Sequence, residues 1–347
     1  MPPVVSDYKW MRPLTELVLT LAIAGAGGLV FFAAGLPAPW LSGPAVGVGS
    51  AAIAGARLSI PGWLRHVTLV FLGASMGSAV TPQTLSLLAK WPVSILGVAV
   101  SVTGIMVASS TYLMRVHGYD RTTARLAAVP GALTYVMALA AESQCDRSRV
   151  VIIQMFRLAA LLVCLPTLLA LFGFAPAALS PASATTVRLH EVGLLFAAGL
   201  LGAFIFSQLK APAAPLFGSL VTGAILYGSG ILSTGVPAWL MLPSFVIIGA
   251  MVGTNFRSVD RALLADTALA GIGCLIIGAA VAMLCALPMA WLLGLPVAKM
   301  WLSYAPGGVD VMTIMALALG LDPAFVGGHH VVRFLGLGLF APMWLRN

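Results

Sequence analysis

Two arginines, Arg157 and Arg333, are the charges that lie deepest within the apolar runs of this chain. Each stands eight or nine residues beyond the expected start of a helix, which places it roughly 12–14 Å along the helix axis. If these runs cross a bilayer, a central arginine costs about 2.5 kcal/mol or more and marks a functional site. A guanidinium can grip a carboxylate or a phosphate with two hydrogen bonds. The sequence therefore predicts that both arginines, and Arg333 above all, bind an anion.

A second interpretation gives the same arginines a structural role. Each side chain would then donate hydrogen bonds to the carbonyls of a broken helix, or pair with an internal acid, and so hold the broken segment in place. The sequence leaves both interpretations open for Arg157, whereas polar neighbours favour the binding role for Arg333.

Both arginines belong to a frame that occurs twice, at the constant offset that separates Arg157 from Arg333. We call residues related by this offset equivalent. The frame consists of Pro-Gly, an apolar run, an aspartate and a second apolar run that contains the arginine. Without any gap, 9 of the 41 equivalent pairs between 126–166 and 302–342 are identical, including the prolines, the aspartate and the arginine. The chain is therefore predicted to be a duplication, with a first membrane repeat at 1–174, an external linker at 175–190 and a second repeat at 191–347.

The second copy of the frame carries more polar side chains than the first. The first copy has Ala128, Thr134 and Gln154 where the second has Tyr304, Asp310 and His330. His330 precedes Arg333 by three residues, so the two are neighbours on a helix. Tyr304 is expected to contact the substrate, and Asp310 and His330 to handle a coupling ion, H⁺ or Na⁺. A salt bridge from Asp310 to Arg333 is the alternative.

No metal or other cofactor is expected. His329 and His330 are adjacent, but no third ligand stands at a suitable spacing. Asp146 and Asp322 are interpreted as helix N-caps, because a proline follows Asp322 at the first helical position.

The Pro-Gly pairs predict breaks in both copies of the frame. Proline removes a backbone hydrogen bond and glycine tolerates strained dihedral angles. Broken backbone persists at membrane depth only where it is buried in protein or lines a wet cavity. The backbone at Gly131, Gly307 and Gly308 is therefore expected to help bind the substrate.

The composition identifies an all-α polytopic membrane protein. Hydrophobic residues make up 60% of the chain and charged residues 8%, whereas soluble domains carry about 25% charged residues. Apolar segments long enough to cross a bilayer follow one another, and the polar stretches 115–125 and 176–190 are expected to be loops. The net charge of +8 comes from basic residues at segment ends. The expected partners are the lipid bilayer and a small solute and not nucleic acid, and a homo-oligomer is left open.

Small residues recur at the helix-packing spacing in both repeats. Gly73 and Gly77 in the first repeat match Gly249 and Gly253 in the second. Because small residues let helix backbones approach closely in lipid, these glycines are expected to pack helices together.

Charge placement favours two inverted repeats with five spans each, plus a re-entrant or broken Pro-Gly segment in each. In that topology, 13 of the 16 lysines and arginines outside the apolar runs lie on the inner side, and only Lys90, Arg188 and Lys299 lie outside. An odd number of spans inverts the second repeat, as in many secondary transporters. The alternative is a chain of twelve full spans in which proline only kinks the fifth.

The duplicated frame resembles the AbrB-type bacterial membrane proteins. The resemblance rests on Pro130, Gly131, Asp146 and Arg157 with their second copies, and it covers essentially the whole chain. Members are labelled as regulators or as ammonia monooxygenases. The resemblance implies a multi-pass protein of the bacterial inner membrane, and the charge pattern places its N-terminus in the cytoplasm.

Inverted repeats with broken segments and midplane charge favour a secondary transporter of a small anionic solute. A membrane sensor that affects gene expression indirectly is the alternative. An enzyme is not expected, because oxygen chemistry needs a metal or organic cofactor and the five histidines form no such ligand set.

Overall fold

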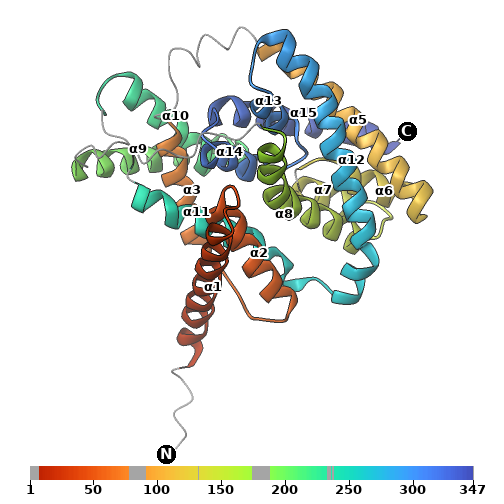
Figure 1. The fold of residues 1–347 in the computed structure, drawn as a ribbon, viewed down its shortest axis with the longest axis horizontal. Helices are drawn as coiled ribbons and strands as arrows, with labels where there is room; N and C mark the ends of the chain where they lie inside the picture. The colour runs from red at the N-terminus through yellow and green to blue at the C-terminus, as the bar shows by residue number, and fades with distance from the viewer. Residues whose placement is uncertain are drawn as a thin grey trace, which may run out of the picture.

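The computed structural model describes residues 8–77, 91–131, 133–173, 188–232, 236 and 238–346. Within these ranges every regular element is a helix (Figure 1). The first half contains α1 (Tyr8–Ala33), α2 (Pro39–Ile53), α3 (Gly62–Met76), α5 (Trp91–His117), α6 (Arg121–Ala128), α7 (Leu133–Ala141) and α8 (Arg147–Leu171). The second half contains α9 (Leu189–Gln208), α10 (Ala214–Gly228), α11 (Ala238–Thr254), the short 3₁₀ helix η3 (Asn255–Ser258), α12 (Arg261–Leu293), α13 (Val297–Tyr304), α14 (Val309–Ala318) and α15 (Pro323–Arg346).

The helices recur in the same order in both halves. The bounds of α6 and α13 are equivalent residues, and α8 and α15 also begin at equivalent residues. The predicted break is confirmed in both copies, since α6 and α7 flank Pro130-Gly131 and α13 and α14 flank Pro306-Gly307. Helices of eight to ten residues are only about 12–15 Å long, far less than a hydrocarbon core of about 30 Å.

Parts of the expected loops are helical. The stretch 115–125 was expected to be a loop, but α5 runs to His117 and α6 begins at Arg121. The carboxylate of Asp120 explains the early start, because it accepts a hydrogen bond of 2.9 Å from the backbone N–H of Thr123 and caps the helix. The expected linker at 175–190 lies outside the described residues up to 187, and α9 begins at Leu189.

The chain is a membrane protein. Six helices in the described part are long and apolar enough to cross a bilayer, namely those at 14–33, 91–117, 147–171, 189–208, 239–257 and 261–293. The helices α2 and α10 have only 15 residues each. They are therefore about 22 Å long and cross a full hydrocarbon core only where it is thin.

The helices form two groups that each draw on both halves of the chain (Figure 1). We call α1, α2, α3, α9, α10 and α11 the outer group, and α5 to α8 with α12 to α15 the core group. The predicted packing role of the paired glycines is confirmed within the outer group. Gly249 and Gly253 of α11 lie against the backbone of α2. Gly73 of α3, and Gly77 directly after α3, lie against the backbone of α10. Each third helix thus packs on the second helix of the other half.

Two equivalent helices, α5 and α12, run antiparallel through the core group. Tyr112 lies against Gly273, and Gly97 lies against Met289, so residue numbers rise along α12 as they fall along α5. The hydroxyl of Tyr112 also donates a hydrogen bond of 3.2 Å to the carbonyl of Leu269. In Figure 1 these two long helices lie on the side of the molecule away from α1 and α9.

Candidate functional site

Arg157 of α8 holds the first broken segment. The side chain is 2% exposed, and Nη2 donates a hydrogen bond of 2.7 Å to the carbonyl of Val129, while Nη1 lies 3.4 Å from the carbonyl of Ala127. Carbonyls at the end of a helix lack partners within the helix. The guanidinium supplies those partners, which is the structural role that the sequence left open.

Arg333 of α15 makes the matching contacts with the second broken segment. Its Nη1 donates a hydrogen bond of 2.7 Å to the carbonyl of Ala305, and its Nη2 donates to the carbonyl of Gly307. Val129 and Ala305 are equivalent residues, so the same contact occurs in both halves.

One helical turn before each arginine, the two halves differ. Gln154 donates to the carbonyls of Leu126 and Val129, both at 3.2 Å, and its Oε1 accepts a hydrogen bond of 3.1 Å from Arg157. His330 reproduces only the first of these contacts, with 3.0 Å from Nε2 to the carbonyl of Leu302. Its Nδ1 is buried and has no hydrogen-bond partner among the described residues. The second half therefore has a free polar atom beside its arginine.

The two breaks meet at the centre of the core group. Gly131 has a φ of +74°, and a Cβ at this position would lie 2.9 Å from the carbonyl oxygen of Gly307 and 3.0 Å from Nη2 of Arg333. A Cβ at Gly308 would lie 3.2 Å from Leu158, the residue that follows Arg157. The structure thus brings together five of the predicted site residues.

Two other predicted site residues point away from this centre. Tyr304 is fully buried against α5, where its hydroxyl donates a hydrogen bond of 2.8 Å to the carbonyl of Ser94. Asp310 lies 3.5 Å from Nη2 of Arg65, which belongs to α3 of the outer group. The alternative salt bridge between Asp310 and Arg333 is therefore wrong, because the carboxylate turns to the other helix group.

No carboxylate in the described part of the chain compensates the central arginines. Neither Arg157 nor Arg333 takes part in any of the five ion pairs between described residues. Carbonyl dipoles stabilise the two cations, but they do not cancel the net charge. The centre therefore carries an excess of positive charge that favours an anion.

A second polar cluster, which the sequence did not predict, lies around the start of α15. Lys299 is 8% exposed and pairs with Asp322 at 3.1 Å, a partner that its expected position on the outer side did not indicate. Close by, Nε2 of His329 lies 2.6 Å from the hydroxyl of Ser94, and its ring packs at a tilt against that of Phe325 with 4.1 Å between centroids. The residue equivalent to Lys299 in the first repeat is Thr123, whereas the aspartate is present in both repeats. This difference between the repeats is the sequence signal that could have indicated the ion pair.

The cap interpretation of both aspartates is confirmed. Asp146 accepts a hydrogen bond of 3.1 Å from the backbone N–H of Arg149, and Asp322 accepts one of 3.0 Å from that of Phe325.

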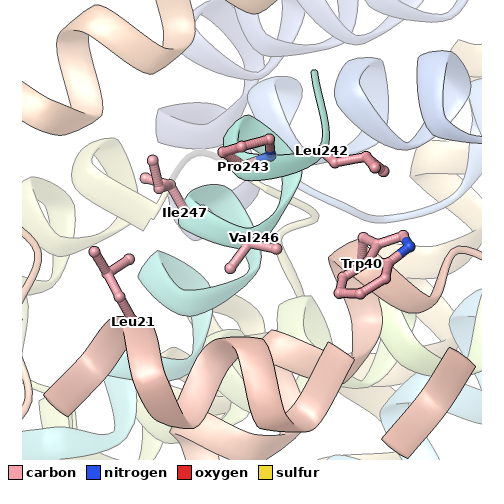
Figure 2. A pocket seen from close by; sticks show the side chains of 6 residues that line it. All are labelled: Leu21, Trp40, Leu242, Pro243, Val246 and Ile247. Atoms are coloured by element: carbon pink, nitrogen blue, oxygen red, sulfur yellow. The ribbon is translucent and has the colours of Figure 1, made fainter. Parts of the chain in front are cut away.

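Two cavities differ in their relation to the arginines. A cavity of about 360 Å³ between α1, α2 and α11 is lined by hydrophobic residues and no charged one (Figure 2), namely Leu21, Trp40, Leu242, Pro243, Val246 and Ile247. A cavity of about 650 Å³ lies between α5 and α15 and is bordered by Arg333 and Arg125. Arg333 therefore reaches a cavity, whereas the lining residues of neither cavity include Arg157.

Comparisons with known proteins agree on one family. Residues 40–347 match the family model described as transition state regulatory protein AbrB. The uncharacterized protein YhjN of Bacillus subtilis (strain 168) is 26% identical over 363 residues, covering 93% of this chain and 91% of its own length. A protein of Escherichia coli (strain K12) that is named as a candidate regulator, AbrB, is 24% identical over 337 residues, covering 90% of both chains.

Proposed function

Because this chain belongs to the AbrB family of membrane proteins, we propose that it is a multi-pass protein of the bacterial inner membrane that transports a small anionic solute. One observation carries the proposal: two broken helical segments meet between two buried arginines that no described carboxylate neutralises. Secondary transporters place their substrate where broken helices meet near the midplane. Arg333 grips the anion in this account, aided by Arg157 and by the backbone at Gly131, Gly307 and Gly308.

The arrangement of equivalent helices supports inverted repeats. The antiparallel packing of α5 against α12 is what inversion requires of two equivalent helices. Residues that the charge pattern puts on the inner side also contact one another. Arg257 donates a hydrogen bond of 3.3 Å to the carbonyl of Leu58, and Arg149 pairs with Asp266 at 3.3 Å. In this account the chain has ten spans with a cytoplasmic N-terminus, and the broken segments enter the membrane from opposite faces.

Alternating access in this account is a movement of the core group against the outer group. Few polar contacts cross the boundary; one is the hydrogen bond of 2.8 Å from Ser42 to the carbonyl of Leu162, and another is the ion pair of Arg65 with Asp310. Arg65 is half exposed, so this pair is weak enough to open and close. Asp310 exchanges Arg65 for a coupling ion, H⁺ or Na⁺, and His330, whose buried Nδ1 has no partner among the described residues, takes part in the same coupling.

Ligand binding tests the site. Purified protein is screened for thermal stabilisation by a panel of small carboxylates and phosphate esters. A stabilising compound is then titrated against the Arg333→Ala variant and against Arg115→Ala, an exposed control in the last turn of α5. We expect Arg333→Ala to weaken binding at least tenfold and Arg115→Ala to leave it unchanged. Unchanged binding by Arg333→Ala would show that the assigned site is wrong.

The name of the relative from Escherichia coli favours one other function, a membrane sensor that influences gene expression indirectly. A sensor needs the same anion site but no passage through the membrane. Binding of a ligand without any flux in proteoliposomes would therefore favour the sensor.

A further inference from the structure

The cavity between α5 and α15, which we call the α5–α15 cleft, opens on the lipid-facing side of the core group. Phe340 and Met343 of α15 line it and are exposed. Leu96 and Leu339, which are next to lining residues in the sequence, are exposed as well. The lining is mainly apolar, with arginines as its charged members: Ile95, Val98, Ala99, Val102, Thr103, Met106, Arg125, Val332, Arg333, Gly336, Leu337, Phe340, Met343 and Trp344.

The equivalent interface in the other half is closed. There α8 packs on α12, and the ring of Phe156 fills the notch at Gly271, where a Cβ would lie 2.8 Å from Cδ1 of the ring. The residues equivalent to Phe156 and Gly271 are Val332 and Ile95, and both line the cleft. Two branched side chains, valine and isoleucine, cannot pack as closely as a phenylalanine ring inserted into the space above a glycine. The cleft therefore exists because the two halves differ in sequence at this interface.

A second difference lies at the other end of the interface. In the closed copy Trp301 is 3% exposed, and its Nε1 donates a hydrogen bond of 3.0 Å to the carbonyl of Ala279. The residue equivalent to Trp301 is Arg125, which lines the cleft instead of filling it. Its guanidinium lies 5.0 Å from the ring centre of Trp344 and donates a hydrogen bond of 3.0 Å to the Trp344 carbonyl. A buried ring has thus been replaced by a cation at the mouth.

The charge at this mouth is positive and not neutralised in the described part of the chain. Arg121 is exposed one turn before Arg125, so both lie on one face of α6. Neither takes part in the ion pairs between described residues. The nearby Asp120 directs its carboxylate to the backbone N–H of Thr123.

The length of the cleft matches one leaflet. Along α15, the distance from Arg333 to Trp344 is about 16 Å at the helical rise of about 1.5 Å per residue. Half of a hydrocarbon core of about 30 Å is about 15 Å. The cleft therefore runs from the interfacial level, where Trp344 and Arg125 lie, to the level of the broken segments.

We infer that the α5–α15 cleft binds a phospholipid with an anionic headgroup, taken from the surrounding bilayer. Its acyl chain lies along α5 and α15, and its phosphate contacts Arg125 beside Trp344. Basic pockets between membrane helices bind anionic headgroups in this way. The apolar cavity of Figure 2 has no basic side chain and would accept a chain without selecting a headgroup. This inference goes beyond the proposed transport and does not depend on it.

Native mass spectrometry tests the inference. Delipidated protein is titrated with dioleoyl phosphatidylglycerol or with dioleoyl phosphatidylcholine, and the bound lipids are counted. Gly336→Leu plugs the cleft, because a Cβ at Gly336 meets open space; Gly338→Leu is the matched control, since its Cβ also meets nothing and Gly338 does not line the cleft. Val332→Phe is a second plug, which copies Phe156 of the closed interface. Arg125→Gln removes the cation from the mouth.

We expect the wild-type protein to retain one phosphatidylglycerol with at least a tenfold preference over phosphatidylcholine. Gly336→Leu and Val332→Phe should each weaken that binding at least fivefold, Gly338→Leu should leave it unchanged, and Arg125→Gln should abolish the preference for the anionic lipid. Equal binding of the two lipids by the wild-type protein would overturn the inference. Full retention of phosphatidylglycerol by both plugged variants would also overturn it. A wild-type dimer that dissociates in the plugged variants while lipid binding persists would overturn it too, because a second copy of the chain would then be the occupant of the cleft.

Discussion

Arg157 and Arg333 do the same structural work but face different surroundings. Each donates to the carbonyl at the end of a short helix, at 2.7 Å in both halves. Arg157 is closed in by Gln154, which accepts one of its hydrogen bonds. Arg333 borders a cavity and lies beside Gly131 of the other half. The structural role is therefore shared, and Arg333 differs from Arg157 in bordering a cavity and in lying beside the break of the other half.

The structural role predicts a loss of stability when Arg157 is removed. Arg157→Ala removes the side-chain donor to the buried carbonyl of Ala127 and leaves the carbonyl of Val129 with only the longer hydrogen bond from Gln154. An unsatisfied buried group costs about 1–3 kcal/mol. Arg157→Lys should cost less, because the charge remains although the fork is lost. Thermal unfolding in detergent measures both, with Arg115→Ala as the exposed control. An unfolding midpoint of Arg157→Ala equal to that of the control would contradict this role.

Substitution of Asp310 is expected to separate anion binding from coupling to an ion gradient. Asp310→Asn removes the charge that pairs with Arg65 at 3.5 Å but leaves the central arginines in place. We expect the variant to bind the anion and to exchange it, while net uptake no longer responds to an imposed proton or sodium gradient. Arg65→Gln keeps the carboxylate and should retain the response. Gradient-driven uptake by Asp310→Asn at the wild-type level would remove Asp310 from the coupling mechanism.

At the scale of elements, the broken helices could be predicted because proline and glycine act locally. Pro130-Gly131 and Pro306-Gly307 end α6 and α13 wherever the rest of the chain lies. The partners of the neighbouring polar residues could not be predicted in the same way. Tyr304 turned to Ser94 on α5 and Asp310 to Arg65 on α3, because those contacts depend on how distant helices pack.

The meeting of the breaks predicts a special sensitivity at Gly131. Gly131→Ala and Gly118→Ala both place an alanine at a left-handed position, with φ of +74° and +66°, at about 1–2 kcal/mol each. Only at Gly131 would the methyl group press on Gly307 and Arg333, because nothing lies within 4 Å at Gly118. We expect Gly131→Ala to unfold at a lower temperature than Gly118→Ala and to bind the stabilising anion more weakly. Equal effects of the two variants would mean that contact between the breaks is unimportant.

At the scale of the whole molecule, the duplication was visible in the sequence but its interlocking was not. The constant offset between the two copies of the frame predicts equivalent helices. The offset does not predict that α3 packs on α10 and α11 on α2. Periodic small residues indicate that one face of a helix packs closely on another helix, but they do not identify that helix. The α5–α15 cleft was equally hidden, since it arises from the difference between Phe156 and Val332 across two interfaces.

Inversion of the repeats predicts opposite accessibility of two sites on the chain. In intact cells, a tag inserted near Ser180 should react with an impermeant reagent from outside. A cysteine at Arg121, in a chain whose four native cysteines have been replaced, should react only after the membrane is opened. A protected tag near Ser180, with Arg121 also on the inner side, would support twelve spans and parallel repeats.

Transport past the central arginines is the claim on which the account depends, and flux measures it most directly. Protein in proteoliposomes is supplied with the radiolabelled carboxylate or phosphate ester that stabilises it most. The account predicts saturable uptake that is lost with Arg333→Ala and retained with Arg115→Ala. Wild-type protein that binds this compound but moves none of it, under proton and sodium gradients of either direction, would contradict transport and leave a sensor in its place.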